Sequence, residues 1–307
     1  MITKDTKIES SCSEADNAEF FSDQHFFDDV EREKFVTKIA LDESEKKGEI
    51  AIYSLENSSL SINMPILENL GFLIDSEMAI KLTRKNKELY CRKYFVKDIN
   101  KESFLQSKEN IAAIIDATLK SHQENSSLNA LAYLANLTPR QILLLNAISV
   151  YLDQLIPILS EKMITNALIT HFQVANYLIH YFEVKFDPEG KNRKSSLGQI
   201  EEKFFDYLQK IDKINEDRVI RLFFKIIQSL LRTNYYFNHD TVAVKVDVRA
   251  LESELGGLQP HIEAFIFHHD FMGCHLRRSN VSRGGLRWSD RHDDFRDEVK
   301  ALMKAQR

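Results

Sequence analysis

The stretch VSRGGLRWSDRHDDFRDEVKALMKAQR, residues 281–307, carries the most specific information in the chain of 307 residues. Its two adjacent glycines, Gly284 and Gly285, allow a tight turn and a close approach of the backbone to a ligand. Guanidinium groups nearby can hold a carboxylate through two parallel hydrogen bonds. They belong to Arg277, Arg278, Arg283, Arg287, Arg291 and Arg296. The pattern indicates an anion site.

A second interpretation of the same stretch is a solvated strand, loop and helix. In that case the arginines pair with acids of the same segment. These acids are Asp290, Asp293, Asp294, Asp297 and Glu298. Spacing alone leaves both interpretations open.

The literal wording of the stretch resembles the start of the catalytic domain in the large bacterial NAD-specific glutamate dehydrogenases. The similar segments are Arg283 to Arg291, Asp294-Phe295-Arg296, Glu298-Val299 and Leu302 to Gln306. Upstream, Pro65 to Gly71 (PILENLG) and Gln141 to Gln154 resemble further segments of that family. The resemblance covers residues from about 34 to 307. Departures occur at Arg277-Arg278-Ser279-Asn280, where the family favours Arg-Gly-Gly-Lys, and at Asp297 and Lys300.

The resemblance implies glutamate catabolism in the full-length family: oxidative deamination of L-glutamate to 2-oxoglutarate and ammonium, with NAD as hydride acceptor, in an oligomer. It implies that Arg283, Gly284, Gly285 and Arg287 contribute to binding the substrate. The catalytic lysine is expected beyond Arg307, together with the NAD-binding domain, so Lys304 is not that lysine. This chain is therefore expected to have no catalytic residue, to bind no NAD alone, and to be inactive without a complementary polypeptide. The alternative function is a non-catalytic regulatory or interaction module acting with another chain.

The periodicity of apolar residues predicts an α+β chain that is predominantly helical. We expect a weakly ordered or disordered leader at 1–33 and an ACT-like α+β module at 34–102. A helical region at 103–236 and the incomplete start of an α/β catalytic domain at 237–307 follow. Expected strands cover 34–41, 49–55, 72–83, 88–96, 242–248, 262–267 and 271–276. Expected helices cover 61–70, 111–119, a run from Pro139 that Pro157 interrupts, 161–186, 198–212, 216–233 and 290–307.

The last segment, 241–307, is expected to leave strand edges and one helix face uncovered. Its apolar side chains would then lack partners. They are Leu286, Trp288, Phe295, Val299, Leu302 and Met303.

Composition excludes several classes of protein. A net charge of −5 and a pI near 6.1 argue against a general nucleic-acid-binding protein. Three cysteines, far apart and without Cys/His metal spacing, predict a reduced cytoplasmic protein with no metal site. The sequence has no secretory signal pattern and no apolar run long enough to span a membrane. It also has no GxGxxG motif of the kind that binds dinucleotides.

Overall fold

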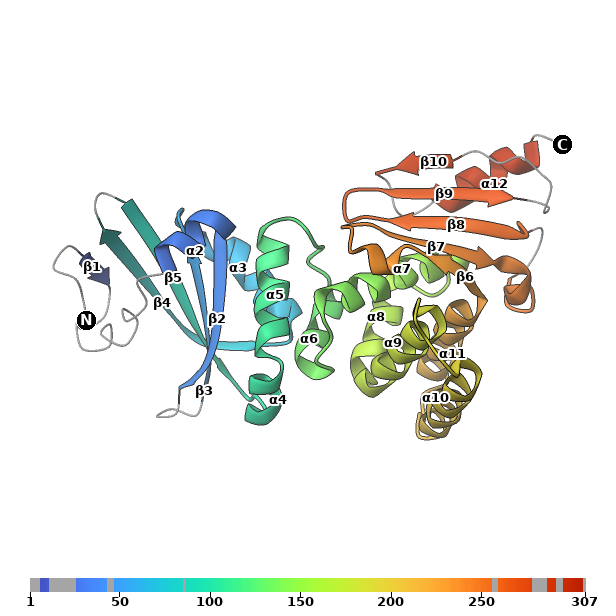
Figure 1. The fold of residues 1–307 in the computed structure, drawn as a ribbon, viewed down its shortest axis with the longest axis horizontal. Coiled ribbons are helices and arrows are strands. Elements are labelled where there is room, and N and C mark those ends of the chain that lie inside the picture. Colours follow the sequence, from blue (N-terminus) through green and yellow to red (C-terminus); the bar gives the residue numbers. More distant parts are fainter. Residues whose placement is uncertain are drawn as a thin grey trace. The chain divides into compact units, whose positions relative to one another are not determined.

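The protein is known from a computed structural model that describes residues 6–10, 26–42, 47–84, 87–255, 259–277, 286–290 and 295–305. The chain divides into two compact units, Met1–Pro139 and Arg140–Arg307. Each unit combines helices with one antiparallel sheet (Figure 1). The predicted α+β class is confirmed, and helices fill the middle of the chain between two parts that contain strands.

The sheet of the first unit has five strands in the order β1-β4-β5-β3-β2, all antiparallel. Their bounds are β1 Thr6–Ser10, β2 Phe35–Asp42, β3 Lys47–Ser54, β4 Leu73–Arg84 and β5 Lys87–Lys97. Four of them confirm the predicted strands. Strand β1 and helix α2 (Phe26–Glu33) were not predicted; they fall within the leader, of which residues 1–5 and 11–25 lie outside the described part.

Both faces of this sheet are partly covered by helices. On one face Tyr94 hydrogen-bonds Asn63 of α3 (Leu60–Asn69) at 3.0 Å, and Thr37 donates to Asp116 of α5 (Lys108–Leu119) at 2.6 Å. The short helices α4 (Lys101–Gln106) and α6 (Leu131–Leu134) complete the unit. On the other face, Val30 of α2 joins a core cluster with strand residues. The cluster contains Ala51, Tyr53, Ile80, Leu89 and Cys91.

The start of α3 differs from the prediction. The helix predicted for 61–70 begins one residue earlier, at Leu60, with Ser59 as the N-cap residue and no side-chain cap bond. Ser59 and Ser61 hydrogen-bond each other through their hydroxyl groups at 2.6 Å. Gly71 ends the helix as predicted, since its φ of 83° lies in the region that glycine adopts without strain.

Five consecutive helices belong to the second unit: α7 Pro139–Leu155, α8 Glu161–Thr170, α9 Phe172–Phe186, α10 Arg193–Leu208 and α11 Ile214–Ser229. The starts of α7 at Pro139 and of α8 after the Ser160 cap confirm the sequence prediction. The single helix predicted for 161–186 is wrong, because the backbone leaves the helical region at His171. The helix predicted from 198 begins earlier, right after Asn192, whose φ of 57° redirects the chain.

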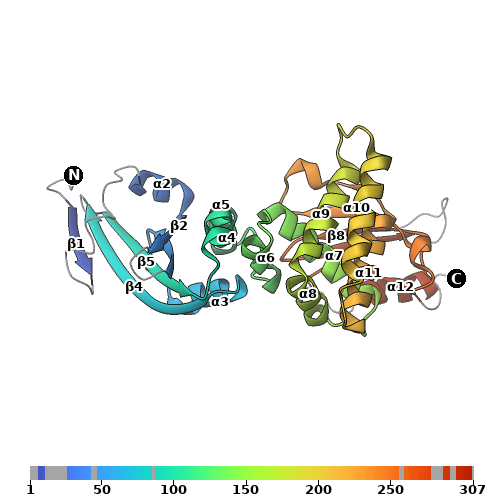
Figure 2. The same cartoon turned by 90° about the horizontal axis from the view of Figure 1, so that it is seen from below.

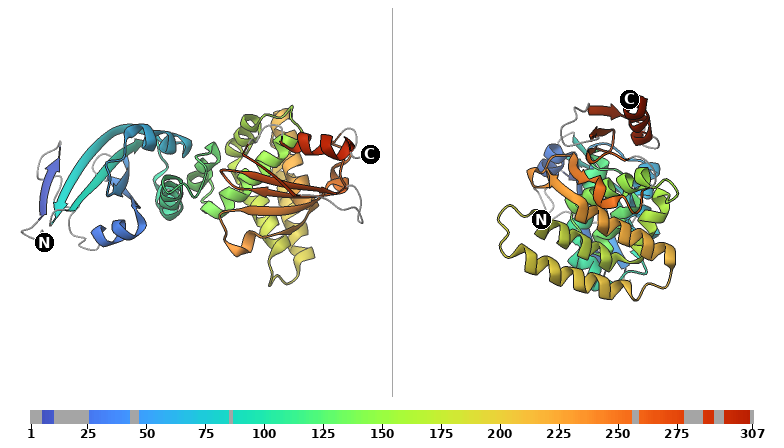
Figure 3. Two further views of the ribbon diagram at one scale, coloured as in Figure 1. Left: turned by 90° about the horizontal axis from the view of Figure 1, so that it is seen from above. Right: turned by 90° about the vertical axis from the view of Figure 1, so that its right-hand side faces the viewer.

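The sheet of the second unit has the order β10-β9-β8-β7-β6 and is antiparallel throughout. Its strands are β6 Leu230–Thr233, β7 Val242–Asp247, β8 Ile262–Phe267, β9 Met272–Arg277 and β10 Leu286–Ser289. The helix predicted to run to 233 therefore ends at Ser229, and its last residues become an edge strand. The final helix, α12, spans Phe295–Ala305. Figures 2 and 3 show the helices of this unit lying against the sheet.

The buried face of β8 is the one that carries its two phenylalanines. Glu263, Phe265 and Phe267 are buried, whereas Ile262, Ala264 and Ile266 are partly exposed. Phenylalanine removes more apolar surface from water than alanine, so the face with two phenylalanines goes inward. Phe295, expected to lack partners, is 4% exposed, whereas Leu302 is 52% exposed. Among the described residues, no helix combines the length and apolar character needed to cross a membrane.

Candidate functional site

The structure describes one of the four residues predicted to bind substrate. Arg283, Gly284 and Gly285 belong to residues 278–285, between β9 and β10 in sequence, and lie outside the described part. Arg287 lies in β10, the edge strand, and is exposed. That Arg287 binds substrate stays a prediction.

Pairing between β10 and β9 decides which way Arg287 points. Arg287 lies opposite Cys274, and Leu286 and Trp288 lie opposite His275 and Gly273. Cys274 is buried on the helix-covered face of the sheet, and paired residues of an antiparallel ladder share a face. Arg287 therefore belongs to the helix-covered face. Within the described part of the chain, its guanidinium donates one hydrogen bond, to the carbonyl of Leu286 at 3.5 Å, and forms no ion pair.

The opposite face of β10 is held by an aromatic contact. The ring of Trp288 lies over Gly273, where an added Cβ would come within 2.8 Å of two ring carbons. Phe271 packs against the same indole edge to face, with the ring centroids 5.4 Å apart. The absence of a side chain at Gly273 thus lets the indole lie flat on the neighbouring strand.

A buried polar cluster joins α12 to the sheet and to α7. Arg296 donates from Nε to both carboxylate oxygens of Glu263 at 3.1 Å, and from Nη2 to Oε2 at 3.0 Å. The hydroxyl of Tyr151 in α7 donates to the same Oε2 at 3.0 Å. The side chains of Arg296 and Glu263 are 1% and 0% exposed. We call Arg296, Glu263 and Tyr151 the α12 cluster.

The electrostatics of the α12 cluster favour a charged pair. Burial alone would lower the pKa of Arg296, but the charge and hydrogen bonds of Glu263 outweigh burial and raise it above its ordinary value. Burial and the Glu263 carboxylate raise the pKa of Tyr151, so its hydroxyl stays protonated and donates. A buried ion pair of this kind gives geometric definition more than net stability. It fixes α12 where the sequence turns from the arginine-rich stretch into the helix.

The α12 cluster tests, for one arginine, the second interpretation, in which the arginines pair with acids of the same segment. Arg296 pairs with Glu263 of the sheet and not with an acid of its own segment. Asp297 instead pairs with Lys300 at 3.5 Å, while Arg291, Asp293 and Asp294 lie outside the described residues. Glu263 and Tyr151 were not identified from sequence. The sequence held one signal for this pair, a glutamate that alternates with Phe265 and Phe267 and so shares their face of the strand. A buried carboxylate needs a cation or hydrogen-bond donors.

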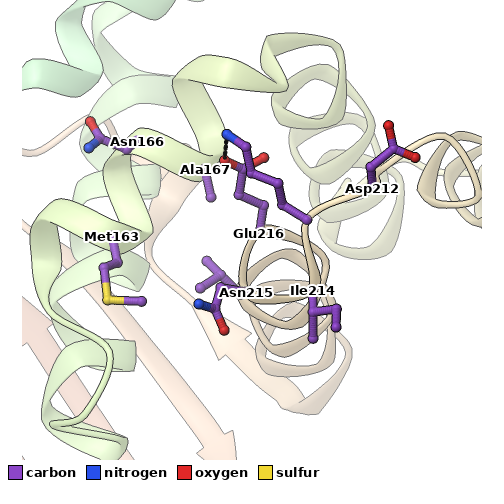
Figure 4. Close-up of a pocket in the computed structure, with 9 residues that line it drawn as sticks. Met163, Asn166, Ala167, Asp212, Ile214, Asn215 and Glu216 are labelled. Carbon is purple, nitrogen blue, oxygen red and sulfur yellow. Dashed lines mark hydrogen bonds and ion pairs between the residues drawn. The ribbon is translucent and has the colours of Figure 1, made fainter.

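A separate hollow of about 660 Å³ lies between α8 and the start of α11. Figure 4 shows its lining: Met163, Asn166 and Ala167 come from α8, and Ile214, Asn215 and Glu216 from α11. Glu216 is held by Lys213 at 2.8 Å and by His171 at 2.8 Å. Arg287, the predicted substrate residue that the structure describes, does not line this hollow.

The described residues do not form a dinucleotide site of the Rossmann type. A dinucleotide site of the Rossmann type needs parallel strands and a glycine-rich turn at a helix N-terminus. Both sheets are antiparallel over their described strands. No cofactor contact is therefore assigned to these residues.

Comparison with known proteins identifies the family. Residues 203–307 match the family described as bacterial NAD-glutamate dehydrogenase, catalytic domain, and residues 123–188 match glutamate dehydrogenase, helical motif 3. The catalytic-domain match begins upstream of residue 237, and the domain boundaries predicted at 102 and 236 stay predictions.

Curated relatives agree. The chain is 31% identical over 263 residues to the NAD-specific glutamate dehydrogenase of Halomonas elongata and 32% identical over 270 residues to that of Pseudomonas aeruginosa. It is 29% identical over 269 residues to that of Mycobacterium tuberculosis. The matches cover 80–81% of this chain and 16% of each relative. The chain therefore belongs to the NAD-specific glutamate dehydrogenase family, of whose curated members it spans about a sixth.

Proposed function

We propose that this chain takes part in the NAD-dependent oxidative deamination of L-glutamate to 2-oxoglutarate and ammonium. Its part is to supply one wall of the substrate site, with Arg283, Gly284, Gly285 and Arg287 holding a carboxylate. The observation that carries the proposal is Arg287 itself. It is an exposed arginine on an edge strand, with no ion-pair partner among the described residues, inside the stretch that matches the catalytic domain.

The chemistry suits the residues. A guanidinium group presents donors in a planar fork that matches a carboxylate. A surface arginine already paired with an acid would have to break that pair first. In the proposed reaction NAD would supply the hydride acceptor. This chain's residues bind and orient the substrate.

The α12 cluster stabilises the helix that follows the proposed site in sequence. Arg296 and Glu263 fix the helix that follows β10 in sequence, and Trp288 fixes β10 on Gly273. A binding residue is effective only when the structure behind it is rigid. Arg296 is thus a positioning residue in this proposal and does not touch substrate.

A complementation assay tests the proposal. The chain is co-expressed with the part of the Pseudomonas aeruginosa relative that follows the matched segment, and NADH formation from L-glutamate is recorded. We expect turnover only when both polypeptides are present. Arg283→Ala or Arg287→Ala should lower kcat/KM roughly 10- to 200-fold, as the loss of a charged hydrogen bond of about 1.5–3 kcal/mol requires. Arg221→Ala, which removes an exposed arginine of α11, is the matched control.

Two outcomes would overturn the proposal. One is glutamate-dependent NADH formation by the chain alone that Arg283→Ala abolishes, since the chain would then hold the whole site. The other is complemented activity that is unchanged in both arginine variants.

A second candidate function is a regulatory or interaction module in the first unit, acting with another chain. The observation that favours it is the arrangement β3-α3-β4-β5-α5, in which β5 lies between β3 and β4 and β2 occupies the outer position beside β3. This split βαβ order supports an ACT-like module. If this function holds, the chain binds the complementary polypeptide while the arginine variants leave turnover unchanged.

The setting of the enzyme is part of the proposal. As the family resemblance implies, we expect it to work in the cytoplasm, as an oligomer, and in glutamate catabolism. Neither nucleic acid nor membrane is expected among its partners.

A further inference from the structure

The connection between β8 and β9 brings three ligand-type side chains together. His268 and Phe271 exchange backbone hydrogen bonds of 3.0 and 3.3 Å, which leaves His269 and Asp270 as the two residues of a tight hairpin turn. Figure 1 shows β8 and β9 joined by this short connection at one end of the sheet. Three consecutive residues with metal-ligating side chains thus occupy one turn.

The donor atoms are close enough to share one ion. Asp270 Oδ2 lies 3.2 Å from His269 Nε2 and 3.7 Å from His268 Nδ1, and ligand atoms of the three residues all lie within 4.8 Å of one another. Around a tetrahedral zinc ion with ligands at 2.0–2.1 Å, donor atoms are about 3.3–3.5 Å apart. Two separations already approach that value, and the third is reached by turning one ring.

We propose that His268, His269 and Asp270 form a binding site for a divalent transition-metal ion of the zinc class, with water in the fourth position. Two imidazoles and one carboxylate are a ligand set for Zn²⁺, Co²⁺, Ni²⁺ or Cu²⁺. Mg²⁺ and Ca²⁺ prefer sites made of oxygen atoms alone. The site is new with respect to the dehydrogenase function and does not depend on it.

The protonation of His268 suits a ligand. Its Nδ1 accepts a hydrogen bond of 3.2 Å from the backbone N–H of Asp270, so this nitrogen carries a lone pair and not a proton. A metal ion bound at Nδ1 would replace this one long hydrogen bond.

The packing behind the turn limits how the rings can move. The His268 ring stacks on Phe271, with the centroids 4.8 Å apart and the planes at 21°, and it lies 4.0 Å from the His269 ring. The side chains of His268 and His269 are 15% and 16% exposed, whereas Asp270 is 72% exposed. Stacking on Phe271 therefore orients the His268 ring, which leaves the His269 ring to turn and the exposed Asp270 carboxylate to adjust and close the site.

Titration of the untagged full chain tests the site. Zn²⁺ binding is measured by calorimetry, and Co²⁺ binding by the visible absorption of a tetrahedral complex. We expect one ion per chain, and at least tenfold weaker binding in the double variant His268→Gln, His269→Gln. His261→Gln, which removes a histidine preceding the same strand, is the matched control and should bind as the parent does. Mg²⁺ should not compete.

Circular dichroism and the fluorescence of Trp288 establish that each variant is folded. Asp270→Asn, at an exposed position, provides a second variant that leaves both rings in place and should also weaken Zn²⁺. Two results would overturn the proposal: no Zn²⁺ binding to the parent chain, or equal binding to the parent and the double histidine variant.

Discussion

Arg296 of α12 and Glu263 of β8 form an ion pair that is almost completely shielded from water, with side chains 1% and 0% exposed and 3.0 Å between Nη2 and Oε2. The pair joins the last helix to a central strand of its sheet. Because Tyr151 of α7 donates to the same carboxylate, three elements meet at one buried charge.

We predict that Arg296→Ala lowers the free energy of unfolding by about 3–5 kcal/mol, because it leaves the Glu263 carboxylate buried without a cation. Urea unfolding of the parent and variant measures the difference. Hydrogen exchange should show the loss first in α12 and in β8.

The control replaces the whole α12 cluster. In Arg296→Met, Glu263→Leu, Tyr151→Phe the buried charges are removed together, and replacement of a buried pair by apolar residues of similar volume is often neutral or stabilising. We expect the triple variant to be more stable than Arg296→Ala. Equal loss in both would mean that packing, and not the unpaired charge, causes the effect.

The α12 cluster also shows where sequence reasoning succeeds and fails. Seven of the ten described strands were predicted, because alternation needs only the local order of residues, whereas β1, β6 and β10 were not predicted. Alternation could not decide the buried face of β8, because Ile262, Ala264 and Ile266 alternate as regularly as the residues between them. Only the size of Phe265 and Phe267, and the distant cation of Arg296, place Glu263 inside.

Other differences have the same origin in tertiary contacts. The break between α8 and α9 occurs at His171, where Nε2 lies 2.8 Å from a carboxylate oxygen of Glu216 in α11. Ser229 ends α11 because Leu230 to Thr233 pair with β7. Neither partner is near in sequence. Of the predicted substrate residues, Arg287 lies on strand β10 in the structure, while Arg283, Gly284 and Gly285 lie outside the described part.

We predict that Arg140→Ala destabilises the second unit by roughly 1.5–3 kcal/mol, the range for hydrogen bonds to charged groups. Arg140 donates to the carbonyl of Tyr235 at 2.8 and 3.0 Å, to that of His239 at 2.5 Å and to that of Thr241 at 3.4 Å. Chemical unfolding measures the loss. Arg140→Lys should recover only part of it, since an ammonium group lacks the planar fork; full recovery by lysine would contradict this account.

We predict that Lys185 makes stability rise with pH in the alkaline range. Its Nζ donates to the carbonyls of Ile227 and Gln228 at 3.0 and 2.6 Å, and burial lowers its pKa from 10.5 to about 8. Between pH 8 and 10.5 the unfolded state then binds more protons than the folded state, so the free energy of unfolding increases with pH. Below pH 8 both states are protonated and the slope disappears.

The measurement for Lys185 compares variants, because tyrosines titrate in the same range. Urea unfolding from pH 7 to 10.5 should show a smaller positive slope in Lys185→Met than in the parent. Lys191→Met, at an exposed position, should keep the parent's slope. An unchanged slope in Lys185→Met would show that the two carbonyls stabilise the ammonium enough to cancel the effect of burial.

We predict that two of the three thiols do not react in the folded chain. Cys91 and Cys274 are 1% and 0% exposed, and burial raises the pKa of each to about 12. The thiolate is the reactive form, so both shielding and protonation suppress reaction. In a Cys12→Ser variant, a thiol reagent at pH 8 should label no cysteine until urea is added and then label two. Rapid labelling of Cys274 without urea would indicate that the sheet opens near β10.

We predict that Gly273→Ala displaces Trp288 and loosens β10 while leaving the rest of the fold intact. An alanine Cβ would lie 2.8 Å from two carbons of the indole ring, closer than atoms approach without a shift, and the ring is the end of a side chain that can move. Because the chain has a single tryptophan, its fluorescence reports on this strand alone. We expect red-shifted emission and stronger quenching by acrylamide, with unchanged far-ultraviolet circular dichroism.

Gly198→Ala is the matched control, since no atom lies within 4 Å of its added Cβ. It sits in α10, where replacing glycine by alanine adds up to about 1 kcal/mol of helix stability. Identical fluorescence in the parent, Gly273→Ala and Gly198→Ala would show that the indole does not rest on Gly273, and β10 would then need another explanation for its place at the edge of the sheet.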